Sequence, residues 1–322
     1  MKKRIKWIDI AKGYGIILVI YGHVTNDSFS LWLYTFHVPL FFFLSGYFFD
    51  PAKKTTDFIK SKTKGLLLPY LTLGIPLFLF NMHYGFEPTD LLKSYIIQQR
   101  ASTLWFIAAL FAQFIIAYIL YRTISSLFYR WIIIGILAMT GVSLWHNGLL
   151  SMPWNTDISM VTLPFFCLGH DLRHNHQFNN IISPNHNFIY ILVFFTITII
   201  GTIIMLHIPY PTVDLYASQF SFAPFAYIVA IAGILLTCII SNRWNNMILT
   251  YIGQNSLVYF VWQQDIAIMM ATKISNFLHL FNTLSGISIC LKNIFMVVLS
   301  LIILTILNEI IIRTKLRLLI GK

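Results

Sequence analysis

Long apolar stretches separated by short polar or proline-containing breaks run along the whole chain. Most of them approach the roughly 20 residues that cross a bilayer core as a helix, although the fifth and sixth are shorter. The alternating pattern of membrane β-strands is absent, so the pattern predicts an all-α, polytopic membrane bundle of about ten transmembrane helices. The stretches are Ile8–Val24, Leu31–Phe49, Leu66–Met82, Thr103–Tyr121, Trp131–Trp145, Ile158–Leu172, Asn187–His207, Phe222–Ser241, Leu249–Ala271 and Ile287–Ile312.

The composition agrees with this pattern. Of the 322 residues, 57% are apolar and 10% are charged, whereas soluble domains carry about 25% charged residues. Neither a low-complexity linker nor an internal repeat divides the chain, so we expect residues 1–322 to form a single integral membrane domain.

The net charge of +11 is distributed unevenly. With ten spans and a cytoplasmic N-terminus, seventeen Lys and Arg residues fall on the inner side, and only Lys93, Arg100, Lys273 and Lys292 lie near the outer side. This positive-inside bias predicts that both termini are cytoplasmic, and it gives no support to nucleic-acid binding. Five lysines in residues 50–65 suit contacts with anionic membrane lipids, or with a phosphorylated cytoplasmic ligand.

Ionisable residues stand out in the first apolar stretch, WIDIAKGYGIILVIYGHV, because charge inside a membrane span is costly and usually functional. Lys12 and His23 are eleven residues apart, about three helical turns, so they project from nearly the same face. At 1.5 Å per residue they are separated by roughly 16 Å along the axis. Asp9, one turn before Lys12, is placed to pair with it.

The second stretch returns as LWLYTFHVPLFFFLSGYFF and carries His37 near its start. An antiparallel hairpin would bring His37 to the depth of His23, toward the outer side. Pro39 removes a backbone hydrogen bond near residue 35 and should kink the helix beside His37. Two histidines at one level suit proton transfer. Simple hydrogen bonding between helices is the alternative.

Several motifs together resemble the membrane acyltransferase-3 family, in particular its fucose 4-O-acetylase-like branch. They are WIDIAKGYGIILVIYGH, FHVPLFFFLSGYFF, KTKGLLLPYL, LWFIAALF, PFFCLGHDLR and YIGQNSLVYFVWQ, which are spread over essentially the whole chain. The resemblance implies transfer of an acyl group, usually acetyl, from cytoplasmic acyl-CoA to a hydroxyl of a cell-surface sugar or polysaccharide. It also implies a multi-pass protein of the cell membrane, with glycan-assembly proteins as candidate partners.

The same resemblance assigns roles to individual residues. His23 is the expected general base or acylated residue, with His37 beside it. Lys12 takes the family's usual arginine position, where a lysine can still bind a phosphate of acyl-CoA. We also expect Lys64 and Arg173 to bind the donor, and Asp9, Trp105, Tyr259 and Gln263 to contribute to the substrate site.

Two features limit this assignment. Many members of the family carry histidine where this chain has Gln263, which cannot act as a base. The segment GHDLRHNH, with His170, Asp171, His174 and His176, has a spacing that can bind metal, but solvated loop histidines explain it better, so no metal is expected.

Two other classes of function remain open. A glycolipid or polysaccharide transporter without transferase activity would share the bundle and its polar intramembrane residues, but it would favour inverted repeats. A non-catalytic, sugar-binding relative is the third possibility.

Glu309 is a further ionisable residue near a membrane span, and it could simply pair with Arg313, one turn further on.

Overall fold

The computed structural model describes residues 4–25, 27–148, 151–173, 175–183, 188–208, 213–278 and 286–320. These residues form a helical bundle with one short β-hairpin. The α-helices are α1 (Lys6–Val24), α2 (Ser28–Tyr34), α3 (His37–Tyr47), α4 (Thr55–Lys62), α5 (Leu68–His83), α6 (Pro88–Ile97), α7 (Trp105–Thr123), α8 (Leu127–His146), α9 (Thr156–Leu172), α10 (His176–Ile182), α11 (Phe188–Met205), α12 (Ala223–Arg243), α13 (Met247–Gln254), α14 (Ser256–Trp262), α15 (Met269–Phe277) and α16 (Gly286–Arg313).

Shorter elements interrupt or join these helices. The strands β1 (Val213–Asp214) and β2 (Gln219–Phe220) pair antiparallel, with Val213 opposite Phe220. Two π-helical segments are η1 (Thr63–Leu67) and η3 (Gln263–Ile268), and two 3₁₀ segments are η2 (Pro153–Asn155) and η4 (Lys315–Ile320).

The expected all-α bundle is confirmed, and each apolar stretch of the sequence is helical in its described part. By length and composition, seven helical runs can cross a membrane. The other three stretches are α1, with its intramembrane charges, the short α9, and the interrupted run from α13 to α15. The seven candidate spans are Ser28–Tyr47, Thr55–His83, Trp105–Thr123, Leu127–His146, Phe188–Met205, Ala223–Arg243 and Ile289–Arg313.

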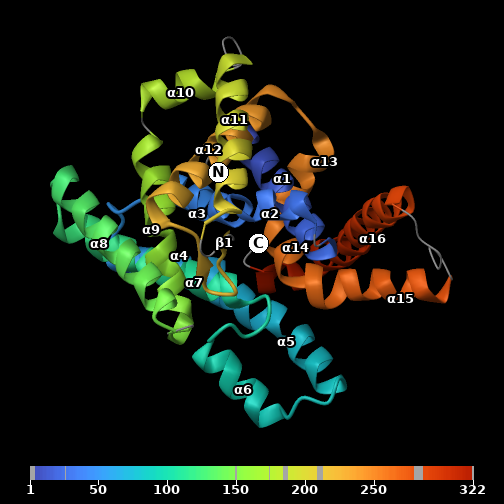
Figure 1. The fold of residues 1–322 in the computed structure, drawn as a ribbon. Helices are drawn as coiled ribbons and strands as arrows, with labels where there is room; N and C mark the ends of the chain where they lie inside the picture. The colour runs from blue at the N-terminus through green and yellow to red at the C-terminus, as the bar shows by residue number, and fades with distance from the viewer. Residues whose placement is uncertain are drawn as a thin grey trace.

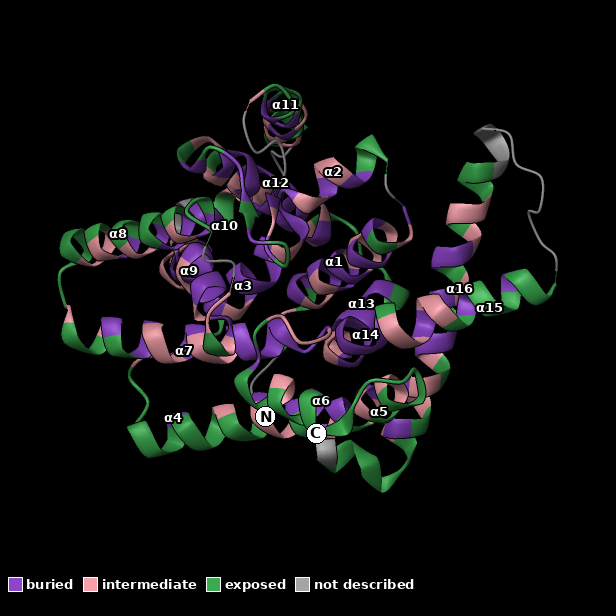
Figure 2. Cartoon of the chain, turned by 60° about the horizontal axis from the view of Figure 1, so that its bottom comes forward, coloured by how far each residue is buried: buried purple, intermediate pink, exposed green. Residues whose placement is uncertain are grey.

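The central helices are buried and the peripheral helices expose apolar side chains. Figure 1 shows α8 and α9 at one end of the molecule and α15 and α16 at the other, with α1 and α3 between them. Figure 2 shows buried residues gathered on α1, α3 and α14. An apolar surface of this kind faces lipid in a membrane bundle. Exposed apolar side chains include Phe128 and Ile136 on α8, Phe188 and Leu192 on α11, and Ile294 and Ile302 on α16.

Two glycines allow the helices that carry the candidate histidines to pack backbone against backbone. A Cβ atom added at Gly253 would lie 1.7 Å from the carbonyl oxygen of Asp9, which fixes α13 against α1. A Cβ atom at Gly46 would lie 1.9 Å from the carbonyl oxygen of Phe166, which fixes α3 against α9. Small residues at helix contacts are typical of membrane bundles, where close packing replaces the hydrophobic effect. The positions of α1 and α3 are therefore set by backbone contact.

The two ends of the described chain lie at the same end of the bundle. Arg4 and Ile320 line one cavity of about 330 Å³ together with Lys12. Termini on one side require an even number of crossings, which agrees with the expected topology. That this side is cytoplasmic stays a prediction from the distribution of charge.

Candidate active site

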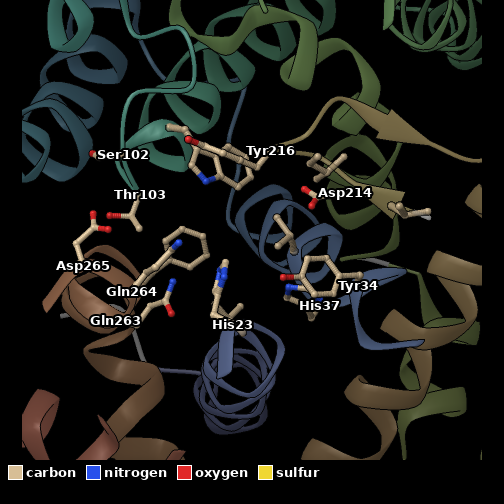
Figure 3. Close-up of a pocket in the computed structure, with 16 residues that line it drawn as sticks. His23, Tyr34, His37, Ser102, Thr103, Asp214, Tyr216, Gln263, Gln264 and Asp265 are labelled. Carbon is tan, nitrogen blue, oxygen red and sulfur yellow. The ribbon is translucent and has the colours of Figure 1, made fainter. Parts of the chain in front are cut away.

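A pocket of about 300 Å³ lies around the C-terminal end of α1 and collects residues from distant parts of the chain. Figure 3 shows its side chains pointing inward from α1, from α2 and α3, from the start of α7, from the β-hairpin and from η3. We call it the histidine pocket. It is lined by Val19, His23, Tyr34, His37, Val38, Ser102, Thr103, Trp105, Val213, Asp214, Leu215, Tyr216, Phe260, Gln263, Gln264 and Asp265.

His23 occupies the middle of this pocket, in the last turn of α1. It also lines a second cavity of about 330 Å³ between α15 and α16, so its ring is accessible although α1 is otherwise mostly buried. In the part of the chain that the structure describes, the ring has no side-chain or backbone hydrogen-bond partner. An accessible imidazole without a fixed partner is available to exchange a proton with a bound substrate.

His37 lies beside His23 in the same pocket, as the sequence predicts. The second span breaks at Phe36, and Pro39 is the third residue of α3, where an N–H would have no partner within the helix. The sequence predicts a kink beside His37, and the structure has a complete interruption there, between the end of α2 and the start of α3. His37 Nδ1 lies 2.6 Å from the carbonyl oxygen of Leu33. A carbonyl only accepts, so Nδ1 carries the hydrogen and Nε2 of the neutral ring is an acceptor.

Gln263 lies on the opposite side of His23 from His37 in Figure 3. It begins the π-helical segment η3, in which Gln263, Gln264 and Asp265, three consecutive residues, all reach the same pocket. π-helical turns are rare and occur often at functional sites.

The Gln263 side chain is only 1% exposed, and its Oε1 atom has no hydrogen-bond partner among the described residues. A buried acceptor without a partner costs about 1–3 kcal/mol. A substrate hydroxyl that donates to it would recover that cost.

Tyr216 lies above the histidines in Figure 3, and Trp105 lines the same pocket. Their ring centroids are 6.1 Å apart. Burial raises the pKa of the Tyr216 phenol, and nearby Asp265 acts in the same direction, so the group is a neutral donor at physiological pH. Its hydroxyl donates to the carbonyl oxygen of Arg100 at 3.0 Å. Trp105 thus lies where the sequence predicts a substrate-contacting residue.

A buried ion pair holds this part of the pocket in place. Arg100 Nη2 is 2.5 Å from Asp157 Oδ2, and the Asp157 side chain is fully buried. Arg100 also donates to the carbonyl oxygen of Tyr216 at 3.0 Å and to Ser218 Oγ at 2.6 Å. Trp145 Nε1 donates to Asp157 at 2.7 Å. The hairpin that carries Asp214 and Tyr216 is therefore tied to α8 and α9 through Arg100.

Backbone strain is concentrated at the same place. Six residues other than glycine have positive φ angles in the described part of the chain, and they belong to three loop segments around this ion pair. Such conformations persist where the surroundings over-determine them, which happens often at functional sites. They are Gln98, Arg100, Ser102, Trp154, Asn155 and Ser218.

A separate cavity of about 330 Å³ opens at the other end of α1. We call it the lysine cavity. Lys12 lines it, with the ammonium group 5.7 Å from the ring centroid of Phe48. Lys62 lines it from the end of α4, 3.2 Å from the ring centroid of Phe114. Two cations in one cavity, half a bilayer away from His23, suit a phosphorylated ligand.

Asp9 lies near this end of α1 but does not form the expected ion pair. Its carboxylate accepts a hydrogen bond from Gln254 Nε2 at 3.2 Å, and the ion pairs formed among the described residues do not include Asp9 with Lys12. The close contact of α1 with α13 explains the exchange of partner. Asp9 lines the cavity that Arg4 and Lys12 share. The expected pair of Glu309 with Arg313 is confirmed, at 2.7 Å.

Three predicted site residues lie elsewhere. Lys64 is exposed on η1, whereas Lys62, the last residue of α4, lines the lysine cavity. Arg173 follows the C-terminal end of α9, where its backbone N–H donates to the carbonyl oxygen of His170. Tyr259 is fully buried and its hydroxyl shares a hydrogen bond with Thr305 on α16, so it faces away from the histidine pocket.

The segment from His170 to His176 falls partly outside the described residues, which omit His174 and the side chain of His176. His170 Nδ1 lies 3.1 Å from the carbonyl oxygen of Phe49, and Asp171 accepts hydrogen bonds from Tyr121 and Trp131. Over the described residues, no group of three or more His, Cys, Asp or Glu side chains is placed to hold a metal ion.

Sequence reasoning missed the loop residues of the site. Asp214 and Tyr216 come from a hairpin between spans, and no motif marks them. Arg100 and Asp157 carried a weak signal, because both are charged residues next to apolar stretches. Lys62 belongs to the cluster of five lysines in residues 50–65, and no motif distinguishes it from the other four.

Comparison with known proteins assigns the chain to a known class. A family model described as an acyltransferase domain, the acyltransferase-3 family, matches residues 5–312. Nodulation protein NolL from Mesorhizobium japonicum is 31% identical over 180 residues, which are 50% of this chain and 46% of that protein. The match thus spans less than half the length of this relative. No solved structure matches the chain.

Proposed function

The chain belongs to the acyltransferase-3 family, and on that premise we propose that it is an O-acyltransferase of the cell membrane, acting as one domain. It transfers an acyl group, which we propose to be acetyl, from cytoplasmic acyl-CoA to a hydroxyl of a cell-surface sugar or polysaccharide. Its seven candidate spans and its family make it a multi-pass membrane acyltransferase. The donor and the acceptor are the proposed part.

The observation that carries the proposal is the arrangement of two sites along one helix. Lys12 and His23 line separate cavities near opposite ends of α1. At 1.5 Å per residue their separation is roughly 16 Å, about half the thickness of the hydrocarbon core. A long, flexible donor with phosphates at one end and a thioester at the other matches this arrangement.

Donor binding is assigned to the lysine cavity. Lys12 and Lys62 provide point charges for phosphate oxygens. Asp9 keeps Gln254 oriented at the edge of the neighbouring cavity. Lys64 and Arg173 are not among the proposed donor contacts, because neither lines the lysine cavity. Lys64 is exposed, and Arg173 comes directly after the C-terminal end of α9.

Acceptor binding is assigned to the histidine pocket. Trp105 and Tyr216 offer aromatic faces to a sugar ring, and carboxylates and amides around them accept hydrogen bonds from hydroxyls. Gln263 Oε1 supports this assignment most directly, because it is a buried acceptor that a sugar hydroxyl can satisfy. Tyr259 is left out, since it binds Thr305.

The proposed reaction is a single acyl transfer. The acceptor oxygen attacks the thioester carbonyl carbon while the His23 imidazole takes the hydroxyl proton. The tetrahedral intermediate collapses, the C–S bond breaks, and the proton held by His23 passes to the CoA sulfur. His37, whose neutral Nε2 is an acceptor, orients His23 or the hydroxyl, and the Gln263 amide contributes a donor for the oxyanion.

The test is sided transfer in reconstituted vesicles. Labelled acetyl-CoA is enclosed on one side, and an oligosaccharide acceptor is added on the other. We expect labelled ester on the acceptor and free CoA on the donor side, in equal amounts. Passage of unmodified saccharide without label would instead identify a transporter. Labelled protein in the absence of acceptor would show a covalent acyl-protein intermediate, and loss of that label in His23→Ala would assign it to His23.

A further inference from the structure

Three phenylalanine rings lie between the lysine cavity and the histidine pocket. The ring centroids of Phe106 and Phe260 are 4.3 Å apart, and those of Phe41 are 5.9 Å from Phe106 and 5.7 Å from Phe260. Each of the three residues is at most 5% exposed. We call this triangle the aromatic partition.

The position of the partition along α1 is fixed by a glycine. A Cβ atom added at Gly15 would lie 2.7 Å from Cζ of Phe41, so the ring rests directly on the backbone of α1. Gly15 comes after Lys12 and before Val19 and His23. The order along α1 is therefore cation, aromatic ring, then the pocket that Val19 and His23 line.

The partition separates two cavities that share one of its members. Phe41, Phe106 and Phe260 all line the lysine cavity, and Phe260 also lines the histidine pocket. Phe260 is thus the wall between them. Trp105 touches this wall from the histidine pocket, 6.4 Å between ring centroids.

These rings contact one another through their faces and edges, and their side chains carry no hydrogen-bonding group. Since no hydrogen bond holds the rings, a change of side-chain rotamer is the smallest movement that opens such a wall. A donor held at Lys12 and Lys62 must bring its thioester past the rings to reach His23. The acyl group is at the end of the donor nearest to His23, so it is the first part of the donor to contact the rings.

The far side of the partition is a small pocket with both apolar and polar walls. Beyond Phe260, the histidine pocket has a volume of about 300 Å³, and Trp105 and Val213 line it together with Thr103, Gln263 and Asp265. An acetyl group needs little of this space. A longer alkyl chain would have to share the pocket with the acceptor, or fold back into space that the three rings occupy.

We propose that Phe41, Phe106 and Phe260 select the acyl donor by size, admitting acetyl and rejecting longer acyl groups. The inference rests on the proposed function, since it assumes an acyl-CoA donor. It names the property that the rings control: the length of the transferred chain. It also explains how a membrane-spanning donor path stays closed when no donor is bound.

The test compares acyl-CoA donors of two lengths with ring-deletion variants. In Phe106→Ala and Phe260→Ala, kcat/KM for butyryl-CoA relative to acetyl-CoA should rise by about tenfold or more, as expected when methylene groups gain apolar space. Phe106→Leu keeps most of the volume and should raise the ratio less. Phe43→Ala is the matched control. Phe43 is fully buried on the same helix as Phe41 and packs against Phe178, so the ratio should stay within about twofold.

A variant of the opposite kind narrows the path. Gly15→Ala pushes a methyl group against the Phe41 ring, so transfer should fall for both donors and fall further for butyryl-CoA. An unchanged butyryl-to-acetyl ratio in the folded Phe106 and Phe260 variants, or an equal rise in Phe43→Ala, would overturn the proposal.

Binding of unreactive S-alkyl-CoA thioethers separates this proposal from the proposed function. We expect affinity to fall from S-ethyl-CoA to S-hexyl-CoA in the wild type, and to fall less steeply in Phe260→Ala. If the thioethers bind but no acyl group is transferred to any acceptor, the transferase function is refuted. The dependence of thioether affinity on alkyl length still tests the partition in that case. Identical length dependence in both proteins would refute the partition even if acetyl transfer occurs.

Discussion

The lysine cavity and the histidine pocket lie at two ends of the same helix, but they are built differently. The lysine cavity is formed by side chains of α1, α3, α4, α7 and α14, with η1, and its polar chemistry comes mainly from Lys12 and Lys62. The histidine pocket needs loops: the segment before α7 and the β-hairpin close over α1, and the Arg100–Asp157 pair holds them. Packing of helices thus makes the proposed donor site, whereas a buried polar network makes the proposed acceptor site.

The largest effect is expected from a variant that breaks the buried Arg100–Asp157 ion pair beside the proposed acceptor site. Asp157→Asn leaves the buried Arg100 charge without its partner, which costs about 3–5 kcal/mol for a buried pair. Thermal unfolding in detergent should shift accordingly, and transfer to the acceptor should be lost. Asp90→Asn removes an exposed ion pair with Lys93 and should change stability by about 0–1 kcal/mol. Equal shifts in the two variants would contradict the special role of the buried pair.

A smaller effect is expected inside the histidine pocket. Gln263→Leu removes the unpartnered Oε1 acceptor, so kcat/KM for the saccharide should fall about 10–100-fold, the value of one or two hydrogen bonds. Gln113→Leu is the control, because Gln113 is equally buried but bonds Thr162 between α7 and α9. It should reduce stability and leave the KM for the saccharide unchanged. A loss confined to stability in Gln263→Leu would argue against acceptor binding there.

The donor side should respond in a different kinetic parameter. Lys62→Met removes a phosphate contact but nothing near His23, so the KM for acyl-CoA should rise about tenfold with little change in kcat. Lys64→Met, two residues away and exposed, should stay within about twofold. Acyl-CoA titrations of initial rates measure both. The reverse ranking would return the donor site to the lysine that sequence matching selects.

The smallest effect is expected from Tyr259→Phe. The variant loses one hydrogen bond to Thr305 and should cost about 0.5–1.5 kcal/mol of stability. Because the hydroxyl faces α16, kcat/KM for either substrate should not change. A clear loss of acceptor affinity would place Tyr259 back among the substrate contacts.

The sequence predicts most of the helical fold and the central part of the site. Apolar stretches mark the spans because each must satisfy its backbone hydrogen bonds inside lipid. His23 and His37 meet in one pocket because an antiparallel hairpin brings them to the same depth, and Pro39 marks the break beside His37. Trp105, which the family resemblance selects, lines the same pocket. Local rules suffice for the two histidines.

Other parts of the site depend on geometry that local rules do not contain. Matching to the family motif selects Lys64, whereas the structure places Lys62, at the end of α4, in the lysine cavity. Asp9 changes partner because Gly253 lets α13 approach α1, a contact between residues far apart in the chain. The ion pair of Arg100 with Asp157 likewise joins the loop before α7 to the first turn of α9.

We propose that His23 transfers the proton and that the donor binds elsewhere on α1. The most direct measurement is His23→Ala in reconstituted vesicles, with labelled acetyl transfer and S-ethyl-CoA binding determined on the same preparation. We predict that transfer falls by at least about a hundredfold, the value of a positioned general base, while S-ethyl-CoA binding stays within about twofold of the wild type. Full transfer activity in the correctly inserted variant would contradict the assignment of His23.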